Sequence, residues 1–247
     1  MSERQTMDVD IVCVGFGPAT GGFLTTLSRG MMNPDGTPKV ESAAMPGSPP
    51  QVICYERADD IGFGVSGVVT LARGIRVSFP DLDPSQIPLC APVKEEKVLY
   101  LLDPVGASRR SAMLRLADKV LKPFAKYQAF ELPYIPPYLQ KHGGLVLSIG
   151  QFNQWVGAQL MGTGTVQIWP GTPVAKPLVD GDKVTGVRLM DQGTDKQGNP
   201  ADGFTPGMDI RAALTVIGDG PVGPIGRQLD EQFGLPAGHH KHDHAIG

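Results

Sequence analysis

The 247-residue chain is short of cysteine, of net charge and of long apolar runs. Its three cysteines, Cys13, Cys54 and Cys90, are widely spaced and include no C-x-x-C pair, which excludes a zinc ribbon or a complete iron–sulfur site. A formal net charge of −3 gives no general attraction to nucleic acid or to an anionic membrane. No apolar run approaches the roughly 18 residues of a transmembrane helix, and the charged first residues contain no secretory segment. These absences favour a cytoplasmic protein, either in the reducing cytosol or at its boundary with a membrane, where partners would hold it on the cytoplasmic face.

Glycine and proline, by contrast, are abundant, with 32 and 23 residues, and they predict many turns and long loops. Hydrophobic residues make up 41% of the chain and charged residues 19%, as in an ordinary globular protein with a sizeable core. The stretch 30–50 is rich in proline, glycine and serine, so we expect a long loop there.

The segment 8–22, DVDIVCVGFGPATGG, combines a short apolar strand, a glycine-rich turn and the start of a helix. This order begins a dinucleotide-binding βαβ unit, in which Gly15 makes the tight turn and Gly17 lets a pyrophosphate approach the backbone. The helix N-terminus then directs free N–H groups at the phosphates. Thr20 replaces the third glycine of the G-x-G-x-x-G pattern, so the motif needs support from the rest of the chain.

A second apolar strand, 51–55, supplies that support because it ends at Glu56. An acidic residue in this place accepts hydrogen bonds from ribose hydroxyls. In compact examples it follows the glycines by about 20 residues, and here the loop 30–50 accounts for its later position. The order of segments predicts nucleotide binding; a structural turn in another α/β protein and a solvated strand end are the alternatives.

The remaining periodicity predicts an α/β protein with a parallel, Rossmann-like sheet. We expect helices at 18–28, 111–124, 151–161 and 225–233, and strands at 11–14, 51–55, 145–147, 166–169, 184–190, 208–211 and 214–217. The predicted domain covers 1–237, with 68–165 as an inserted cap or partner-side region that is partly antiparallel. A β-meander is inserted at 174–217, and the His-rich tail 238–247 is expected to be disordered.

The order of segments resembles the flavin domain of electron-transfer flavoprotein:ubiquinone oxidoreductase, within the glutathione-reductase-type FAD-binding proteins. The glycine turn at 8–22 and the strand and serine–glycine loop VICYERADDIGFGVSG at 52–67 carry this resemblance. So do the proline-rich loop, strand and helix at 132–160 and the meander and later turn at 186–229. The resemblance therefore spans nearly the whole chain.

The resemblance implies FAD as the cofactor, held at the two turns and at the second strand. The residues expected to bind it are Gly15, Gly17, Pro18, Ala19, Thr20, Glu56, Arg57, Ser66, Gly67, Val174, Asp219 and Gly220. No catalytic residue and no metal ligand is predicted, because a flavin itself carries redox chemistry.

Three departures from the family pattern bear on function. Thr20 stands for a glycine, and Ser148 stands where the family usually has an arginine. The chain also ends soon after Asp219, whereas the resemblance implies a further flavin segment, a quinone-binding region and a cysteine-ligated iron–sulfur domain. We therefore expect the protein to work in a complex with at least one other polypeptide.

The resulting prediction is an FAD-binding subunit that relays electrons from a donor similar to electron-transfer flavoprotein towards an iron–sulfur or quinone partner. One alternative is a structural or assembly subunit that keeps the fold without the flavin. Another is a self-contained flavin hydroxylase or reductase, which the lack of a second glycine fingerprint disfavours.

Four of the five histidines, His239, His240, His242 and His244, lie in the C-terminal tail. Such a cluster binds divalent metals, more often adventitiously than as a functional site. The fifth, His142, is the one candidate acid or base, although a surface loop histidine is the preferred interpretation.

Overall fold

A computed structural model describes residues 4–63, 67–102, 111–221 and 223–235. The chain folds into two compact units. The first comprises 1–68, 73–90 and 147–247, and the second comprises 69–72 and 91–146. Sequence analysis expected an inserted region at 68–165 within one domain.

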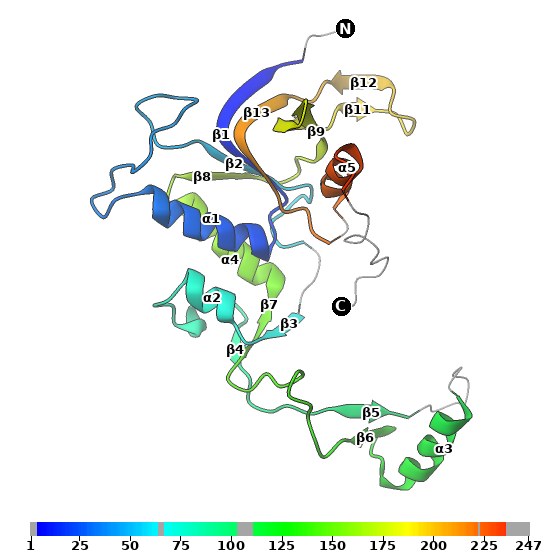
Figure 1. Cartoon of the computed structure of the whole chain (residues 1–247). Coiled ribbons are helices and arrows are strands. Elements are labelled where there is room, and N and C mark those ends of the chain that lie inside the picture. The colour runs from blue at the N-terminus through cyan, green and yellow to red at the C-terminus, as the bar shows by residue number, and fades with distance from the viewer. Residues whose placement is uncertain (1–3, 64–66, 103–110, 222, 236–247) are drawn as a thin grey trace. The chain divides into compact units, whose positions relative to one another are not determined.

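A six-stranded sheet forms the centre of the first unit (Figure 1). Its strands, in spatial order, are β8 (Val166–Trp169), β2 (Val52–Tyr55), β1 (Thr6–Val14), β13 (Asp209–Ile217), β10 (Lys183–Leu189) and β9 (Val174–Asp180). The first four run parallel, and β10 and β9 continue the sheet in antiparallel fashion. The parallel, Rossmann-like α/β architecture predicted from the sequence is confirmed.

Helices cover the sheet where the sequence places apolar stripes. Helices α1 (Pro18–Met31) and α4 (Ile149–Gly162) pack against each other on one face, and α5 (Pro224–Gln232) packs near β9 (Figure 1). The shorter helices α2 (Arg73–Ser78) and η1 (Pro84–Gln86) also belong to this unit. The last four residues of β1, Ile11–Val14, pair with both β2 and β13. This two-sided pairing explains why they are apolar.

Two expectations about the strands were wrong in extent. Strand β1 begins at Thr6 rather than at residue 11, because its polar first half pairs with β13 alone. The segments expected as separate strands at 208–211 and 214–217 form the single strand β13, which pairs with β1 from Asp209 to Ile217.

The polar segment after β10 also differs from expectation. It holds the hairpin β11 (Gln192–Thr194) and β12 (Pro200–Thr205) instead of a plain loop. Asp195 organises the turn by accepting hydrogen bonds from the backbone N–H groups of Gln197 and Asn199. Such local Asx-type hydrogen bonding needs no apolar periodicity, and the hydrophobic pattern therefore did not indicate this hairpin.

The second unit is built from short elements. They are β4 (Ala91–Pro92), β5 (Leu99–Leu101), α3 (Ala112–Leu121), η2 (Lys122–Phe124) and β6 (Ala129–Glu131). Strands β3 (Gly67–Thr70) and β7 (Leu145–Ser148) cross the boundary between the units in the sequence. Strands β5 and β6 pair antiparallel, and Ser111 caps α3 by accepting a hydrogen bond from Leu114 N–H.

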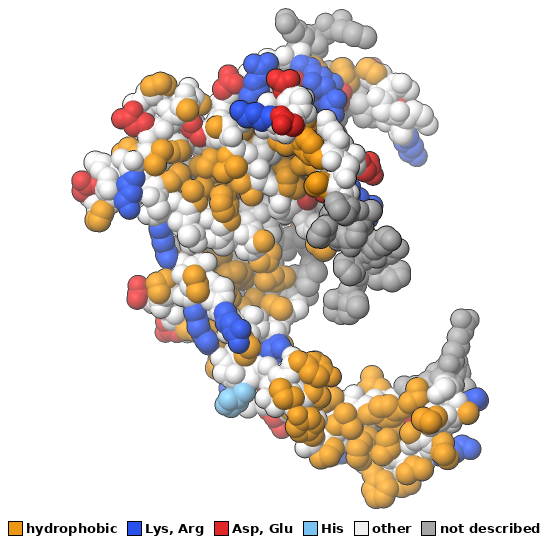
Figure 2. Space-filling view, viewed as in Figure 1, with side chains coloured by type: hydrophobic (Ala, Val, Ile, Leu, Met, Phe, Trp, Pro, Cys, Tyr) orange, Lys and Arg blue, Asp and Glu red, His pale blue; other side chains and the backbone are white. Residues whose placement is uncertain are grey.

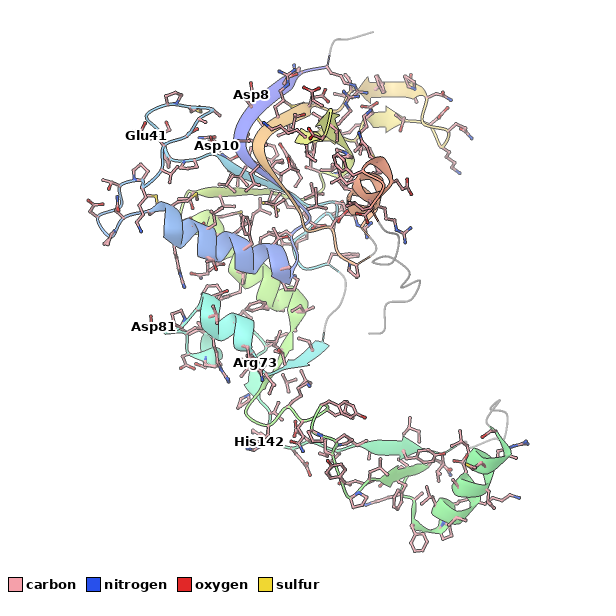
Figure 3. All side chains as sticks on the ribbon, in the orientation of Figure 1. Asp8, Asp10, Glu41, Arg73, Asp81 and His142 are labelled. Atoms are coloured by element: carbon pink, nitrogen blue, oxygen red, sulfur yellow. The ribbon has the colours of Figure 1, made fainter. Side chains whose placement is uncertain are left out.

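Asp10 fixes the long loop between α1 and β2. Asp10 is 8% exposed as a residue. Its carboxylate accepts hydrogen bonds from Ser42 Oγ at 2.6 Å and from the N–H groups of Ala43 and Gln51 at 2.7 Å. Figure 3 labels Asp10 beside the loop that carries Glu41. Burial alone would raise the pKa of Asp10, but these hydrogen bonds outweigh it and lower the pKa.

We expect Asp10→Asn to lower the free energy of unfolding by about 1–3 kcal/mol at neutral pH, because it breaks a buried set of charge-assisted bonds. The pKa of Asp10 is lower in the folded than in the unfolded protein. Its contribution is therefore complete above the unfolded pKa and is lost as the pH falls through the folded one. Urea unfolding between pH 7 and pH 3 measures both effects. Asp8→Asn, an exposed change on the same strand, is the control and should leave stability and its pH dependence unchanged.

Candidate functional site

The turn between β1 and α1 requires a glycine at its first position. Gly15 has φ +83°, and its N–H donates to Tyr55 O at 2.8 Å. A Cβ on Gly15 would lie 2.7 Å from Gly218 O, well inside contact distance. The N–H of Gly218 in turn donates to Val14 O at 2.8 Å. The ends of β1 and β13 are thus locked together without room for a side chain.

The N-terminus of α1 is free to bind an anion. Gly17 is its N-cap residue in extended conformation, no side chain caps the helix, and the first turn contains no acidic residue. Pro18 occupies the next position, where a missing N–H costs nothing. A Cβ on Gly17 would meet no protein atom within 4 Å, so the missing side chain leaves open space rather than relieving a clash.

Glu56 closes the opposite side of this turn. Its Oε2 accepts a hydrogen bond from Phe16 N–H at 2.7 Å, and its Oε1 accepts one from Ala58 N–H at 2.9 Å. These bonds fix the carboxylate against the glycine turn, while each oxygen keeps lone-pair capacity for a further donor. A diol such as a ribose is the chemistry that this arrangement fits.

A cavity of 670 Å³ unites these elements, and all of its lining residues lie in the first unit. Eight predicted site residues line it: Gly15, Gly17, Pro18, Glu56, Arg57, Val174, Asp219 and Gly220. Ala19, Thr20 and Gly67 are absent from the lining, and Ser66 lies outside the described residues. The structure therefore brings together most of the positions proposed from both ends of the chain.

Sequence reasoning predicted a contribution from the loop after β2 through Arg57, Ser66 and Gly67, but it missed the wall that α4 provides and the other residues of that loop. The additional lining residues are Val14, Phe16, Tyr55, Ala58, Gly62, Phe63, Val68, Ile149, Asn153, Gly218, Pro224 and Ile225. Ile149 and Asn153 are four residues apart and share one face of α4. That spacing was the signal available in the sequence, although it does not say which cavity the face meets.

Asp219 has a structural task at the cavity rim. Its Oδ2 accepts hydrogen bonds from the N–H groups of Ile225 at 2.8 Å and Gly226 at 3.4 Å, which caps α5. Gly223 lacks a Cβ where this carboxylate lies. Asp219 thereby holds the start of α5, and with it Ile225, at the edge of the cavity.

Thr20 is accommodated by a glycine on the facing strand end. Its side chain is 2% exposed, and its Oγ1 has no hydrogen-bond partner in the described part of the chain. A Cβ on Gly218 would overlap this Oγ1. The side chain of Thr20, which stands at the third glycine position of the motif, therefore fills space beside Gly218. Thr20 is not among the residues that line the cavity.

Titratable groups near the turn are held in neutral form. Burial raises the pKa of Tyr55 and of Cys13 to about 12, so both stay protonated at neutral pH. His142 is exposed on the loop before β7 in the second unit, outside the cavity lining (Figure 3). Among the described residues, no group of three His, Cys, Asp or Glu side chains is placed to hold a metal, and the tail histidines lie outside those residues.

No protein-family model matches the chain. It is 29% identical over 248 residues to electron transfer flavoprotein-ubiquinone oxidoreductase from Pseudomonas aeruginosa, covering 99% of this chain and 39% of that protein. The mitochondrial protein of the same name from Mus musculus is 28% identical over 247 residues, covering 99% of this chain and 34% of that protein. The resemblance predicted from the sequence is confirmed, and the chain spans little more than a third of these relatives' length.

Solved structures support the fold. A geranylgeranyl bacteriochlorophyll reductase-like protein from Thermoplasma acidophilum superposes with a TM-score of 0.50 at 14% identity, covering 90% of this chain and 42% of that one. A mutant of PqsL from P. aeruginosa gives a TM-score of 0.50 at 13% identity, covering 91% and 46%. At such identities the likeness concerns the fold alone.

The contact between Thr20 and Gly218 is testable by a double-mutant cycle. We expect Gly218→Ala to destabilise the protein by about 1–3 kcal/mol, because the new methyl group overlaps Thr20 Oγ1. Thr20→Ala should be close to neutral, since it removes an unpaired buried hydroxyl along with some packing. The double variant should recover most of the loss, giving a coupling energy of about 1 kcal/mol or more in urea unfolding. Strictly additive effects would contradict this packing.

Proposed function

We propose that the chain binds FAD in this cavity and serves as the flavin-binding part of an electron-transfer oxidoreductase. The observation that carries the proposal is the convergence of three features on one cavity. They are the free N-terminus of α1, the glycine turn without side chains and the backbone-anchored carboxylate of Glu56. This combination fits a dinucleotide better than any single motif does.

Each part of the cavity has a role toward such a ligand. The backbone around Gly15 and Gly17 and the α1 dipole would hold the pyrophosphate, and Glu56 would accept hydrogen bonds from the ribose. Phe63, Val68 and Ile149 supply apolar wall for a planar ring system. Bound FAD supplies the redox chemistry, while the protein orients it and excludes water.

The names of the relatives suggest the electron path. We propose that electrons arrive from a donor similar to an electron-transfer flavoprotein and leave towards an iron–sulfur or quinone partner. The relatives are about 28–29% identical and are named for electron transfer flavoprotein and ubiquinone.

Two of the three departures that favoured the alternative, a structural subunit without flavin, are Thr20 and Ser148. Thr20 lies outside the cavity lining, where Gly218 makes space for it, so it does not fill the site. Ser148 acts as the N-cap of α4, with its Oγ accepting from Gln151 N–H at 3.4 Å. Neither residue removes a feature that the binding proposal uses.

Addition of FAD to the purified chain should give a retained yellow complex with absorbance bands near roughly 370 and 450 nm. Gly17→Leu should abolish retention and leave the unfolding free energy nearly unchanged, because Gly17 lines the cavity and a Cβ there meets no protein atom within 4 Å. Gly30→Leu is the matched control, since a Cβ there also meets nothing and Gly30 is absent from the lining. A colourless wild-type protein would overturn the proposal and favour the structural subunit.

The second unit offers a surface for placing such a protein at a membrane. Met113, Leu116, Val120 and Phe124 are between 60% and 80% exposed on one face of the segment formed by α3 and η2. Figure 2 shows the hydrophobic side chains gathered over α3, β5 and β6. The helix is held from its other face, where Tyr100 Oη donates to Asp118 Oδ1 at 2.7 Å. This outward apolar face is unusual for a water-exposed helix.

We propose that this apolar face lies on an anionic membrane surface. Helical spacing places Arg115, Lys119 and Lys122 on the flank opposite to the apolar residues, against one acidic residue, Asp118. An apolar face with a cationic flank is the pattern of helices that lie in the lipid headgroup region. Within the described residues, no helix has the length and apolarity to cross a bilayer.

Vesicle sedimentation tests this surface. The wild-type protein should sediment with vesicles of phosphatidylcholine containing phosphatidylglycerol, and less with phosphatidylcholine alone. The pair Leu116→Asp and Val120→Asp should weaken binding by about tenfold or more, because buried apolar side chains supply most of the affinity. Val77→Asp, at a 79%-exposed valine of α2, is the control. Membrane contact would be refuted if the variant with both Leu116→Asp and Val120→Asp still bound the vesicles as the wild-type protein does. It would also be refuted if the protein formed a dimer without lipid that covers this apolar face.

A further inference from the structure

The side-chain amide of Asn153 is accessible from the cavity and has no protein partner among the described residues. Asn153 is 7% exposed and lines the cavity from α4. Its amide makes no hydrogen bond to any residue in the part of the chain that the structure describes. Buried amides are nearly always hydrogen-bonded, because an unmet donor or acceptor costs free energy. Asn153 therefore points to a ligand that completes its bonding.

The surroundings of Asn153 indicate which part of a ligand it meets. Ile149 lies one helical turn away on the same face of α4. The loop after β2 is fixed against this end of α4, because Gly62 and Gly150 approach so closely that a Cβ on Gly150 would lie 2.5 Å from Gly62 O. Phe63 follows directly in that loop and lines the same cavity. This subsite is apolar apart from one amide.

The charged groups of the cavity belong to other elements. Glu56 and Arg57 follow β2, and Asp219 follows β13, where its carboxylate caps α5. The phosphate and ribose contacts proposed above use the glycine turn and Glu56. Two neutral polar side chains of the lining are left unused by those contacts, Tyr55 at the end of β2 and Asn153 on α4, and only Asn153 lies on α4 beside Ile149.

We propose that Asn153 is a positioning residue that hydrogen-bonds the polar edge of the isoalloxazine ring of FAD. An amide offers a donor and an acceptor, which matches the alternating N–H and carbonyl groups of the pyrimidine edge of a flavin. The apolar residues beside it match the rest of the ring. This inference rests on the proposed function, since it assigns the flavin half of the cofactor to the subsite on α4.

Ligand titrations with Asn153→Leu test the assignment. Leucine has the same branched arrangement of side-chain heavy atoms and cannot hydrogen-bond, so FAD and riboflavin should bind about tenfold more weakly, whereas ADP should bind as it does to the wild-type protein. The absorbance maximum of the bound flavin should also shift, because hydrogen bonds to the ring tune its electronics. In the ligand-free protein, the variant should unfold at the same or a higher urea concentration, because an unpaired amide is removed.

Gln159→Leu makes the same kind of change on an exposed position of the same helix and should alter none of these measurements. A wild-type protein that binds no FAD overturns the proposed function itself. Wild-type FAD binding that Asn153→Leu leaves unchanged overturns this inference alone. An equal loss of ADP binding also overturns it, because the residue would then act on the nucleotide half or on the fold. Asn153→Ser, which is smaller and keeps a hydroxyl, repeats the comparison if the leucine variant does not fold, with the same outcomes deciding.

Discussion

The site depends on the contact between the ends of β1 and β13, where two glycines let the backbones meet. Gly218 N–H donates to Val14 O, and a Cβ on Gly15 would clash with the backbone of Gly218. A Cβ on Gly218 would instead overlap the side chain of Thr20. Because these strands lie side by side and parallel, residues more than 200 positions apart reach the same edge of the sheet. The free start of α1 and the capped start of α5 are set by that contact.

Local chemistry explains which parts of the fold could be predicted. The glycine turn, helix α1 and strand β2 form a contiguous unit whose residue types reflect their backbone conformations, so sequence analysis located them. It also placed Glu56, because the acid follows directly from the end of β2. Its bond to Phe16 N–H could not be foreseen, since it depends on how the turn and the strand end meet in space.

Other features depended on tertiary partners that no local pattern encodes. The contribution of α4 to the cavity is one, because Ile149 and Asn153 follow the glycine turn by more than 130 residues. The way in which Thr20 is accommodated is another such feature. At the level of the motif it is a defect, but in the structure it is one half of a compensated pair with Gly218. The outward apolar face of α3 was predicted as helical spacing, yet spacing alone does not say whether such a face meets protein, lipid or water.

The residues that line the cavity favour a binding role over a structural one. A protein kept only for its shape gains stability when it fills voids and pairs buried polar groups. This chain instead keeps an uncapped α1, an unpartnered amide at Asn153 and a glycine at position 17 where a Cβ would meet no protein atom within 4 Å. Glycine within or beside a helix loses conformational entropy on folding and gains no packing in return. These three features share one cavity, and the proposed FAD would meet each of them with a different part of its structure.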